Sequence, residues 1–222
     1  MRTKRYLSLL LAVLMGLALT ACGAGKDKKK DAAMTIQPAQ LSEEETALME
    51  LLDIDPADYR IFDFDVSGAK SVRLRAYELA DGEWDCAAHS AYETVEGGGR
   101  IALTFGKMTE GVRMAHKDGA GLGSQEFTME AGGTSGMTFT TSVLGEAKTI
   151  ELDQEIPLAI QIVTSQNEIH SYDVSYFGMP REYAKHGYEH VYAITVTFTA
   201  RAASEPLDAP SAPPSAEPSP AG

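Results

Sequence analysis

Apolar and polar residues alternate with a period of two along much of the chain from residue 60 onward. Phe62, Phe64 and Val66 alternate with Asp63 and Asp65. Successive side chains of a strand point to opposite faces of its sheet, so this period predicts half-buried strands. The same alternation recurs at 72–76 and 101–105, and seven further stretches are rich in β-branched or aromatic residues: 112–117, 125–130, 137–144, 148–152, 156–164, 172–177 and 190–201.

Glycine-rich turns separate these predicted strands, and little helix lies between them. Asp81-Gly82 and Gly97-Gly98-Gly99 are two such turns. Parallel strands would need long crossover connections, which are usually helical. We therefore predict a mainly β fold, namely an antiparallel β-sandwich with a β-barrel as the alternative.

The clearest predicted helix follows Ser42 and is the one N-terminal helix of the fold. Ser42 and Glu45 form a Ser-x-x-Glu capping box, and Leu48, Leu51 and Leu52 fall on one helix face. We expect the helix to cover one end or edge of a sheet, with this leucine stripe packed against the core. The alternative is that the stripe binds a partner.

The N-terminal segment has the pattern of a signal peptide. Arg2, Lys4 and Arg5 precede an apolar run of 13 residues at 7–19. At about 1.5 Å per residue such a run is too short to span about 30 Å of hydrocarbon as a helix. A basic start followed by a short apolar run is typical of an export signal.

The apolar run ends in Leu19-Thr20-Ala21-Cys22, which resembles the lipobox of bacterial lipoproteins position by position. In that family the cysteine thiol is diacylglycerylated, the chain is cut before the cysteine, and the new amino group can be acylated. The resemblance implies that residues 1–21 are removed, that Cys22 carries palmitate-type acyl chains, and that membrane lipid holds the protein. It places the protein on the extracytoplasmic face of the cell membrane.

The composition divides the rest of the chain into three parts. Residues 22–40 lack hydrophobic periodicity and contain a group of lysines, so we predict a lipid-anchored flexible linker. Residues 41–203 are long enough for one well-buried, acidic β domain. Six of the 17 residues from Pro206 to Gly222 are proline, and most others are alanine or serine, so we predict a disordered tail at 204–222. With its lipobox, acidic domain and proline-rich tail, the whole chain resembles small, uncharacterised lipoproteins of clostridia-like Gram-positive bacteria, which implies no particular activity.

The charge excludes one class of partner. Removal of the signal peptide takes the formal net charge from −13 to −16. Binding of nucleic acid requires a basic surface, and beyond the lysines of the linker the sequence has no basic stripe. With Cys22 acylated only Cys86 remains, so no internal disulfide can form.

Several apparent catalytic or metal-binding motifs lack their structural context. Residues 186–190 fit the His-x-x-Glu-His pattern of inverted zinc peptidases, but a glycine interrupts them and a strand follows. Residues 67–70 fit Ser-x-x-Lys, yet they join two predicted strands and we interpret them as a hairpin turn. We interpret Cys86, three residues before His89, as a small buried hydrophobe. The aspartates of 53–65 lack the spacing of a calcium loop. The sequence therefore predicts no catalytic residue, no metal site and no cofactor.

The best candidate binding surface is a group of aromatic residues near the end of the domain. Six of them fall within 21 residues: Tyr172, Tyr176, Phe177, Tyr183, Tyr188 and Tyr192. Tyrosine combines a flat apolar face with a hydrogen-bonding tip, which suits a sugar or peptide ligand. We name Tyr172, Tyr176, Tyr183 and Tyr188 as candidate ligand-binding residues. The alternative is that these rings close one end of the sandwich as part of its core.

The sequence thus favours a membrane-anchored, non-catalytic module that binds a ligand or partner. A glycan, a peptide and an envelope protein are the candidates. The alternative is an extracytoplasmic hydrolase whose acidic residues come together only in the fold, and we favour the binding module because no nucleophile, base and orienting group occur at the spacing of a known family.

Overall fold

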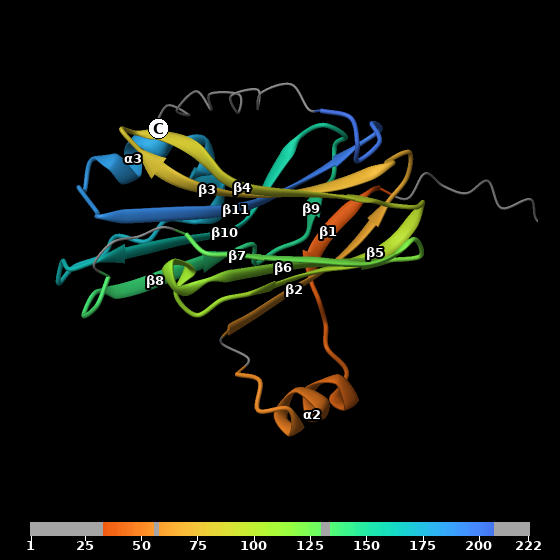
Figure 1. Cartoon of the computed structure of the whole chain (residues 1–222), viewed down its shortest axis with the longest axis horizontal. Coiled ribbons are helices and arrows are strands. Elements are labelled where there is room, and N and C mark those ends of the chain that lie inside the picture. Colours follow the sequence, from red (N-terminus) through yellow and green to blue (C-terminus); the bar gives the residue numbers. More distant parts are fainter. Residues whose placement is uncertain (1–32, 56–57, 130–133, 207–222) are drawn as a thin grey trace, which may run out of the picture. The chain divides into compact units, whose positions relative to one another are not determined.

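The computed structural model describes residues 33–55, 58–129 and 134–206. The predicted signal peptide, Cys22 and most of the predicted tail lie outside these residues. Two antiparallel sheets are stacked face to face (Figure 1). The six-stranded sheet has the order β7 (Gly121–Phe127), β6 (Val112–Asp118), β5 (Gly97–Thr104), β2 (Tyr59–Val66), β1 (Thr35–Pro38) and β9 (Lys148–Thr149). The five-stranded sheet has the order β4 (Glu83–Glu93), β3 (Ser71–Ala80), β11 (His190–Thr199), β10 (Glu155–Thr164) and β8 (Thr138–Val143).

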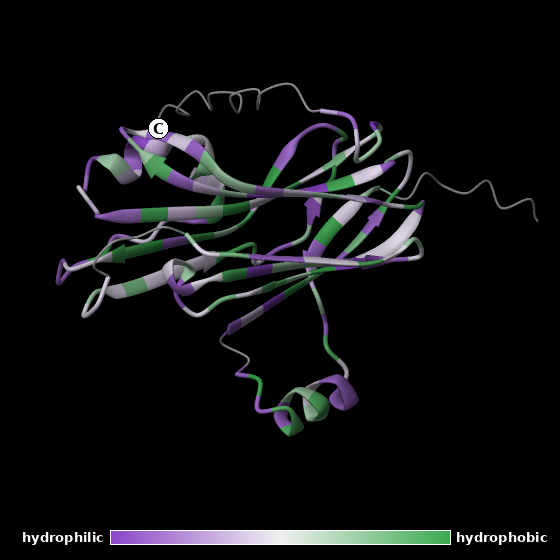
Figure 2. Ribbon diagram, in the orientation of Figure 1, coloured by the Kyte–Doolittle hydropathy of each residue, from purple (hydrophilic) through white to green (hydrophobic). Residues whose placement is uncertain are grey.

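The prediction of a mainly β, antiparallel sandwich is confirmed. Every pairing between the described strands is antiparallel, and the two sheets remain separate, so the barrel alternative is wrong. Apolar and polar residues alternate along many of the strands (Figure 2). The apolar side chains of the two facing sheets meet in the core, where the rings of Phe64 and Phe198 lie 5.0 Å apart.

The five-stranded sheet is covered on both faces near its centre. Every residue from Ile156 to Thr164 of β10 and from Val191 to Thr199 of β11 is buried. One face meets the six-stranded sheet, and the other is covered in part by the connection 165–189 and by residues 200–206. Central strands of this sheet are therefore almost continuously apolar or small, unlike the alternating strands of the other sheet.

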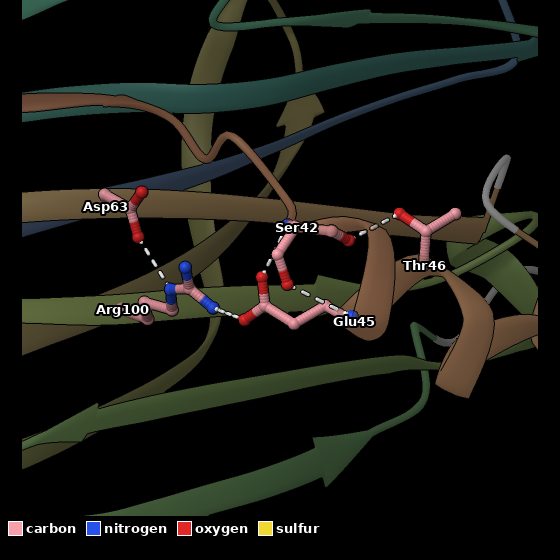
Figure 3. A network of polar contacts seen from close by, with 5 residues as sticks. All are labelled: Ser42, Glu45, Thr46, Asp63 and Arg100. Carbon is pink, nitrogen blue, oxygen red and sulfur yellow. Dashed lines mark hydrogen bonds and ion pairs between the residues drawn. The ribbon is translucent and has the colours of Figure 1, made fainter.

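Helix α2 (Glu43–Leu51) has the predicted cap but not the predicted packing. The Ser42 hydroxyl accepts a hydrogen bond from the Glu45 N–H (3.2 Å), and the Glu45 carboxylate accepts one from the Ser42 N–H (2.8 Å) (Figure 3). No residue of α2 is buried, and Leu48 and Leu51 are exposed. The expectation that the leucine stripe packs on the core is wrong, because α2 contacts the sandwich through Glu45 and Met49 and leaves the leucines exposed.

Four further segments differ from the sequence predictions. Thr35–Pro38, placed in the linker, forms β1, because Ile36 is fully buried between β2 and β9. Residues 67–70 cross from one sheet to the other, so the hairpin prediction is wrong. Residues 172–177 form no strand and instead lead into the 3₁₀ helix η3 (Val174–Gly178), which Asp173 caps. Cys86 is exposed, because it lies on the edge strand β4 rather than in the core.

Two short helices complete the described structure. The 3₁₀ helix η2 (Met108–Glu110) lies between β5 and β6, and α3 (Pro180–Ala184) follows η3. Within the described part of the chain, no helix combines the length and apolar character needed to span a bilayer.

Candidate functional site

The predicted tyrosine cluster lies on the connection 165–189 between β10 and β11. This connection contains η3, which contacts β10, and α3, which contacts β4. Phe177 of η3 packs against Tyr77 of β3, with ring centroids 5.5 Å apart. Tyr77 lies on the face of β3 opposite to Leu74 and Ala76, so the connection covers the face of the five-stranded sheet that points away from the other sheet.

A carboxylate joins the two ends of this connection, which we call its neck. Glu189 accepts hydrogen bonds from the hydroxyl groups of Ser165 and Thr164 and from the Ser165 N–H. These bonds, with that of Ser165 the strongest, lower the pKa of Glu189 to about 2. The Gln166 side chain adds bonds to the carbonyl oxygens of His186 (3.0 Å) and Gly187 (3.1 Å). The two ends of the connection are thus held together next to the strands that it joins.

Trp84 of β4 fixes the connection to the sheet. Its indole N–H donates a hydrogen bond to the Phe177 carbonyl oxygen (2.7 Å), and its ring stacks on Phe177 at 5.2 Å. The edge of Tyr183, which is only 1% exposed, meets the same indole ring at 6.1 Å. Tyr183 and Phe177 therefore form the buried base on which the outer rings rest.

The outer rings form a continuous group above this base. Tyr172 stacks on Tyr176 at 4.7 Å and meets the edge of Tyr183 at 5.1 Å. His186 stacks on Tyr188 at 5.2 Å and on His170 at 4.8 Å. We call these residues the ring cluster: Tyr172, Tyr176, Tyr188, His170 and His186.

Hydrogen bonds between the polar tips join the two halves of the ring cluster. The Tyr172 hydroxyl lies 2.7 Å from Nε2 of His186. The Tyr188 hydroxyl accepts a hydrogen bond from the backbone N–H of His170 (2.7 Å). Burial, with lesser effects of Asp173 and the two neighbouring tyrosines, raises the pKa of Tyr183, whose buried hydroxyl has no hydrogen-bond partner. The hydroxyl groups of Tyr172 and Tyr188 thus have partners, whereas that of Tyr183 is buried without one.

The structure divides the four tyrosines named from the sequence into two groups. Tyr172, Tyr176 and Tyr188 are half-buried and reach the surface, while Tyr183 belongs to the core beneath them. A surface depression of about 470 Å³ lies beside the start of η3, lined by residues 143–148 and 173–175. Because the outer rings stack on one another, a ligand would meet their edges, hydroxyl groups and imidazole nitrogens.

Sequence reasoning missed His170, His186 and Trp84 as members of this site. The motif at 186–190 suggested that His186, Glu189 and His190 should be weighed together, but the structure separates them. Glu189 closes the neck, and His190 lies 3.4 Å from the Glu78 carboxylate on the other face of the sheet. A usable signal was the His-x-Tyr spacing at His186–Tyr188, which places that imidazole against the phenol ring.

A second polar group lies between the sheets at their opposite end. The His116 ring is 2% exposed and is stacked between Phe64 (5.8 Å) and Tyr92 (5.7 Å). Its Nε2 lies 3.4 Å from the Asp118 carboxylate but has no hydrogen bond. Asp118 also accepts hydrogen bonds from Thr94 and from the N–H groups of Val95 and Ala120.

This second group holds a turn and does not resemble a hydrolase site. A hydroxyl nucleophile needs the imidazole between itself and the carboxylate, whereas here the carboxylate lies between Thr94 and His116. Burial lowers the pKa of His116, although the negative charge of Asp118 opposes that shift. Burial alone would raise the pKa of Asp118, but its hydrogen bonds lower it.

A third polar group lies on the outer face of the five-stranded sheet. Glu155 accepts hydrogen bonds from the hydroxyl groups of Tyr77 (2.7 Å) and Thr195 (2.6 Å), and Arg75 lies 3.4 Å from the same oxygen. Burial, followed by the charge of Glu155, raises the pKa of Tyr77. Cys86 pairs with Tyr77 across β3 and β4, and neighbouring atoms desolvate its thiol enough to raise its pKa. A thiol that resists ionisation is a poor nucleophile.

The acidic residues of the described structure form no metal site. Asp63 accepts a hydrogen bond from Arg100 (2.7 Å), and Asp65 is exposed. Among the residues that the structure describes, no three His, Cys, Asp or Glu side chains lie close enough together to hold a metal ion. Comparison with protein-family models, with curated proteins and with solved structures found no match.

Proposed function

We propose that the chain is an extracytoplasmic lipoprotein, attached to the cell membrane through acylated Cys22, whose β-sandwich is a non-catalytic binding module. The observation that carries the proposal is Leu19-Thr20-Ala21-Cys22 at the end of a short apolar run. Each CH₂ of an acyl chain that enters the bilayer contributes about 0.8 kcal/mol, so two chains on one cysteine suffice for stable attachment.

The anchor is tested by metabolic labelling with a palmitate analogue. The wild-type chain should incorporate the label and remain in the membrane fraction, and Cys22→Ala should do neither. Cys86→Ser is the matched control, since it removes the other cysteine and should label like the wild type. Equal labelling of Cys22→Ala and the wild type would refute the anchor.

For the binding module, we propose that the ring cluster is the ligand site and that the ligand is a glycan or a peptide. Three half-buried tyrosines and two imidazoles offer apolar edges and hydrogen-bonding tips on one patch. The buried base and the closed neck hold the patch in place before a ligand arrives, which reduces the entropy lost on binding.

The binding site is tested by titrating the protein with two probes, a soluble N-acetylglucosamine oligomer and a mixture of short peptides, while recording NMR spectra. Shifts should concentrate on residues 165–189 for one of the probes. Tyr176→Phe and Tyr188→Phe should weaken that binding about fivefold each, the value of one net hydrogen bond. Tyr59→Phe, a half-buried tyrosine on β2, is the control. Unchanged affinity in both cluster variants would refute the site.

A further inference from the structure

Helix α2 carries an apolar face that nothing in the described part of the chain covers. The exposed fractions are 55% for Leu48, 81% for Leu51 and 60% for Leu52. At about 100° per residue, these leucines share one arc in the C-terminal half of α2, and Glu44 and Glu45 of the first turn lie on the same arc. Glu43 and Glu50 lie on the opposite arc. A solvent-exposed leucine face on a short helix of this kind marks a contact surface.

Two contacts hold α2 beside the sandwich while its leucines stay exposed. The guanidinium group of Arg100 joins Glu45 of the helix to Asp63 of β2 (Figure 3). Met49 lines an apolar groove of about 220 Å³ together with residues of β1, β2 and β8. Glu45 and Met49 are one helical turn apart and attach their side of α2 to the sheet, whereas Leu48 and Leu51 stay exposed beside it. The position of α2 beside the sheet is therefore fixed by specific contacts.

The lipid anchor brings a bilayer within reach of this face. From Cys22 to Ala33, where the described structure begins, the chain has 11 steps. Such a segment spans roughly 40 Å when fully extended, and about 18 Å on average as a flexible coil. Tethering at these distances raises the local concentration of a second contact to the millimolar range.

We propose that α2 lies on the bilayer that holds Cys22, with Leu48, Leu51 and Leu52 inserted at the level of the headgroups and upper acyl chains. This proposal rests on the proposed anchoring. It adds a second point of attachment to the lipid anchor and so orients the sandwich on the membrane. Because the inserted side chains are leucines and the glutamates of α2 carry negative charge, the contact needs no anionic lipid and does not weaken as salt is raised. A contact through the lysines near Cys22 would show the opposite dependence.

The test places a fluorophore beside the leucines. In a Cys86→Ser background, Ala47→Cys on α2 and Ser124→Cys on β7 each offer one exposed thiol, since Cys22 is acylated. The processed, lipidated chain carrying an environment-sensitive dye is reconstituted into phosphatidylcholine vesicles that contain nitroxide on the acyl chains. The dye at position 47 should shift to the blue and be quenched, at low and high salt alike, and the dye at position 124 should do neither.

Substitution of the leucines completes the test. Leu48→Ser, Leu51→Ser and Leu52→Ser combined should abolish the shift and the quenching at position 47, whereas Leu122→Ser, which changes a leucine 72% exposed on β7, should leave both unchanged. Protein that floats with the vesicles but shows an unshifted dye would overturn the α2 contact alone. Protein that does not float would overturn the anchor as well. A blue shift without quenching would mean that α2 meets a second copy of the chain, which also overturns the proposal.

Discussion

Two glycines allow an aromatic row to cross between the sheets. A Cβ atom on Gly99 would lie 2.3 Å from Cζ of Phe64, and one on Gly123 would lie 2.2 Å from Cδ1 of Tyr92. The two rings occupy this space, and His116 is stacked between them. An aromatic ring that covers a strand glycine restores the packing that the missing side chain would have supplied.

Gly99→Ala should lower the free energy of unfolding by about 2 kcal/mol, within the range for overpacked cores. The added methyl group would meet the Phe64 ring and also the Lys117 carbonyl oxygen at 2.8 Å, and a backbone atom cannot move aside easily. Gly98→Ala is the control, because its nearest neighbour would be 3.4 Å away. Urea denaturation measures both variants, and equal midpoints would contradict the packing argument.

The buried imidazole in this row gives the stability a pH dependence. Burial lowers the pKa of His116 below its ordinary value of 6.5, so the unfolded chain takes up this proton at a higher pH than the folded chain. The free energy of unfolding should therefore decrease as the pH falls below about 6.5. His116→Phe keeps the stacking and removes the proton, so its stability should change less between pH 7 and pH 5. Parallel curves in chemical denaturation would refute this role of His116.

At the scale of single elements, α2 depends on its cap more than on packing. The Ser42 hydroxyl satisfies one N–H at the helix start, and no residue of the helix is buried. Ser42→Ala should speed amide hydrogen exchange in α2 about fivefold, as expected for a lost N-cap. The midpoint of global unfolding should stay the same, as in the control Ser124→Ala, because the helix lies outside the core. A large fall in the global midpoint would show that α2 is part of the core after all.

The sequence predicts a helix or strand well where the local pattern of residues determines it, and poorly where contacts with distant residues determine it. The alternation at Phe62, Phe64 and Val66 reflects one buried face, so the strand was predictable from its own residues. Residues 172–177 have strand-like composition, but the Asp173 cap and the packing of Phe177 on Trp84 produce a 3₁₀ helix. The attachment of α2 to the sheet depends on a contact between Glu45 and Arg100, 55 residues apart, which no local pattern contains.

The candidate site shows the same division. Local composition indicated that tyrosines gather near the last strand, and the structure brings three of them to the surface. Tyr183 is the buried ring because it packs against Trp84 of β4. Trp84 is distant from Tyr183 in the sequence, and the fold of the sheet brings the two together. His170 belongs to the ring cluster because the hydrogen bonds of Glu189 hold the two ends of the connection 165–189 together. These contacts join distant segments, so the sequence alone could not specify them.

At the scale of the whole molecule, residues 201–206, the last that the structure describes, hydrogen-bond to side chains of β3. Arg73 is 8% exposed, and its guanidinium group donates hydrogen bonds to the carbonyl oxygens of Ala202 (2.9 Å) and Glu205 (2.5 Å). Ser71 donates another to the Arg201 carbonyl oxygen (2.8 Å). Residues 201–206 thus supply acceptors for polar groups on β3 that the sheet does not pair.

Two truncations separate this role from that of the proline-rich residues beyond. A chain that ends at Pro206 keeps every one of these acceptors and should have the same free energy of unfolding as the full chain. A chain that ends at Ala200 leaves Arg73 and Ser71 without them and should lose about 2 kcal/mol, within the usual cost of a buried polar group that loses its partner. Arg73→Met in the shorter chain should restore part of the loss, since it removes the unpaired charge while keeping most of the side-chain volume. If both truncations unfold at the same denaturant concentration, the last described residues do not stabilise the sandwich, and the burial of Arg73 must be supported by the sheet alone.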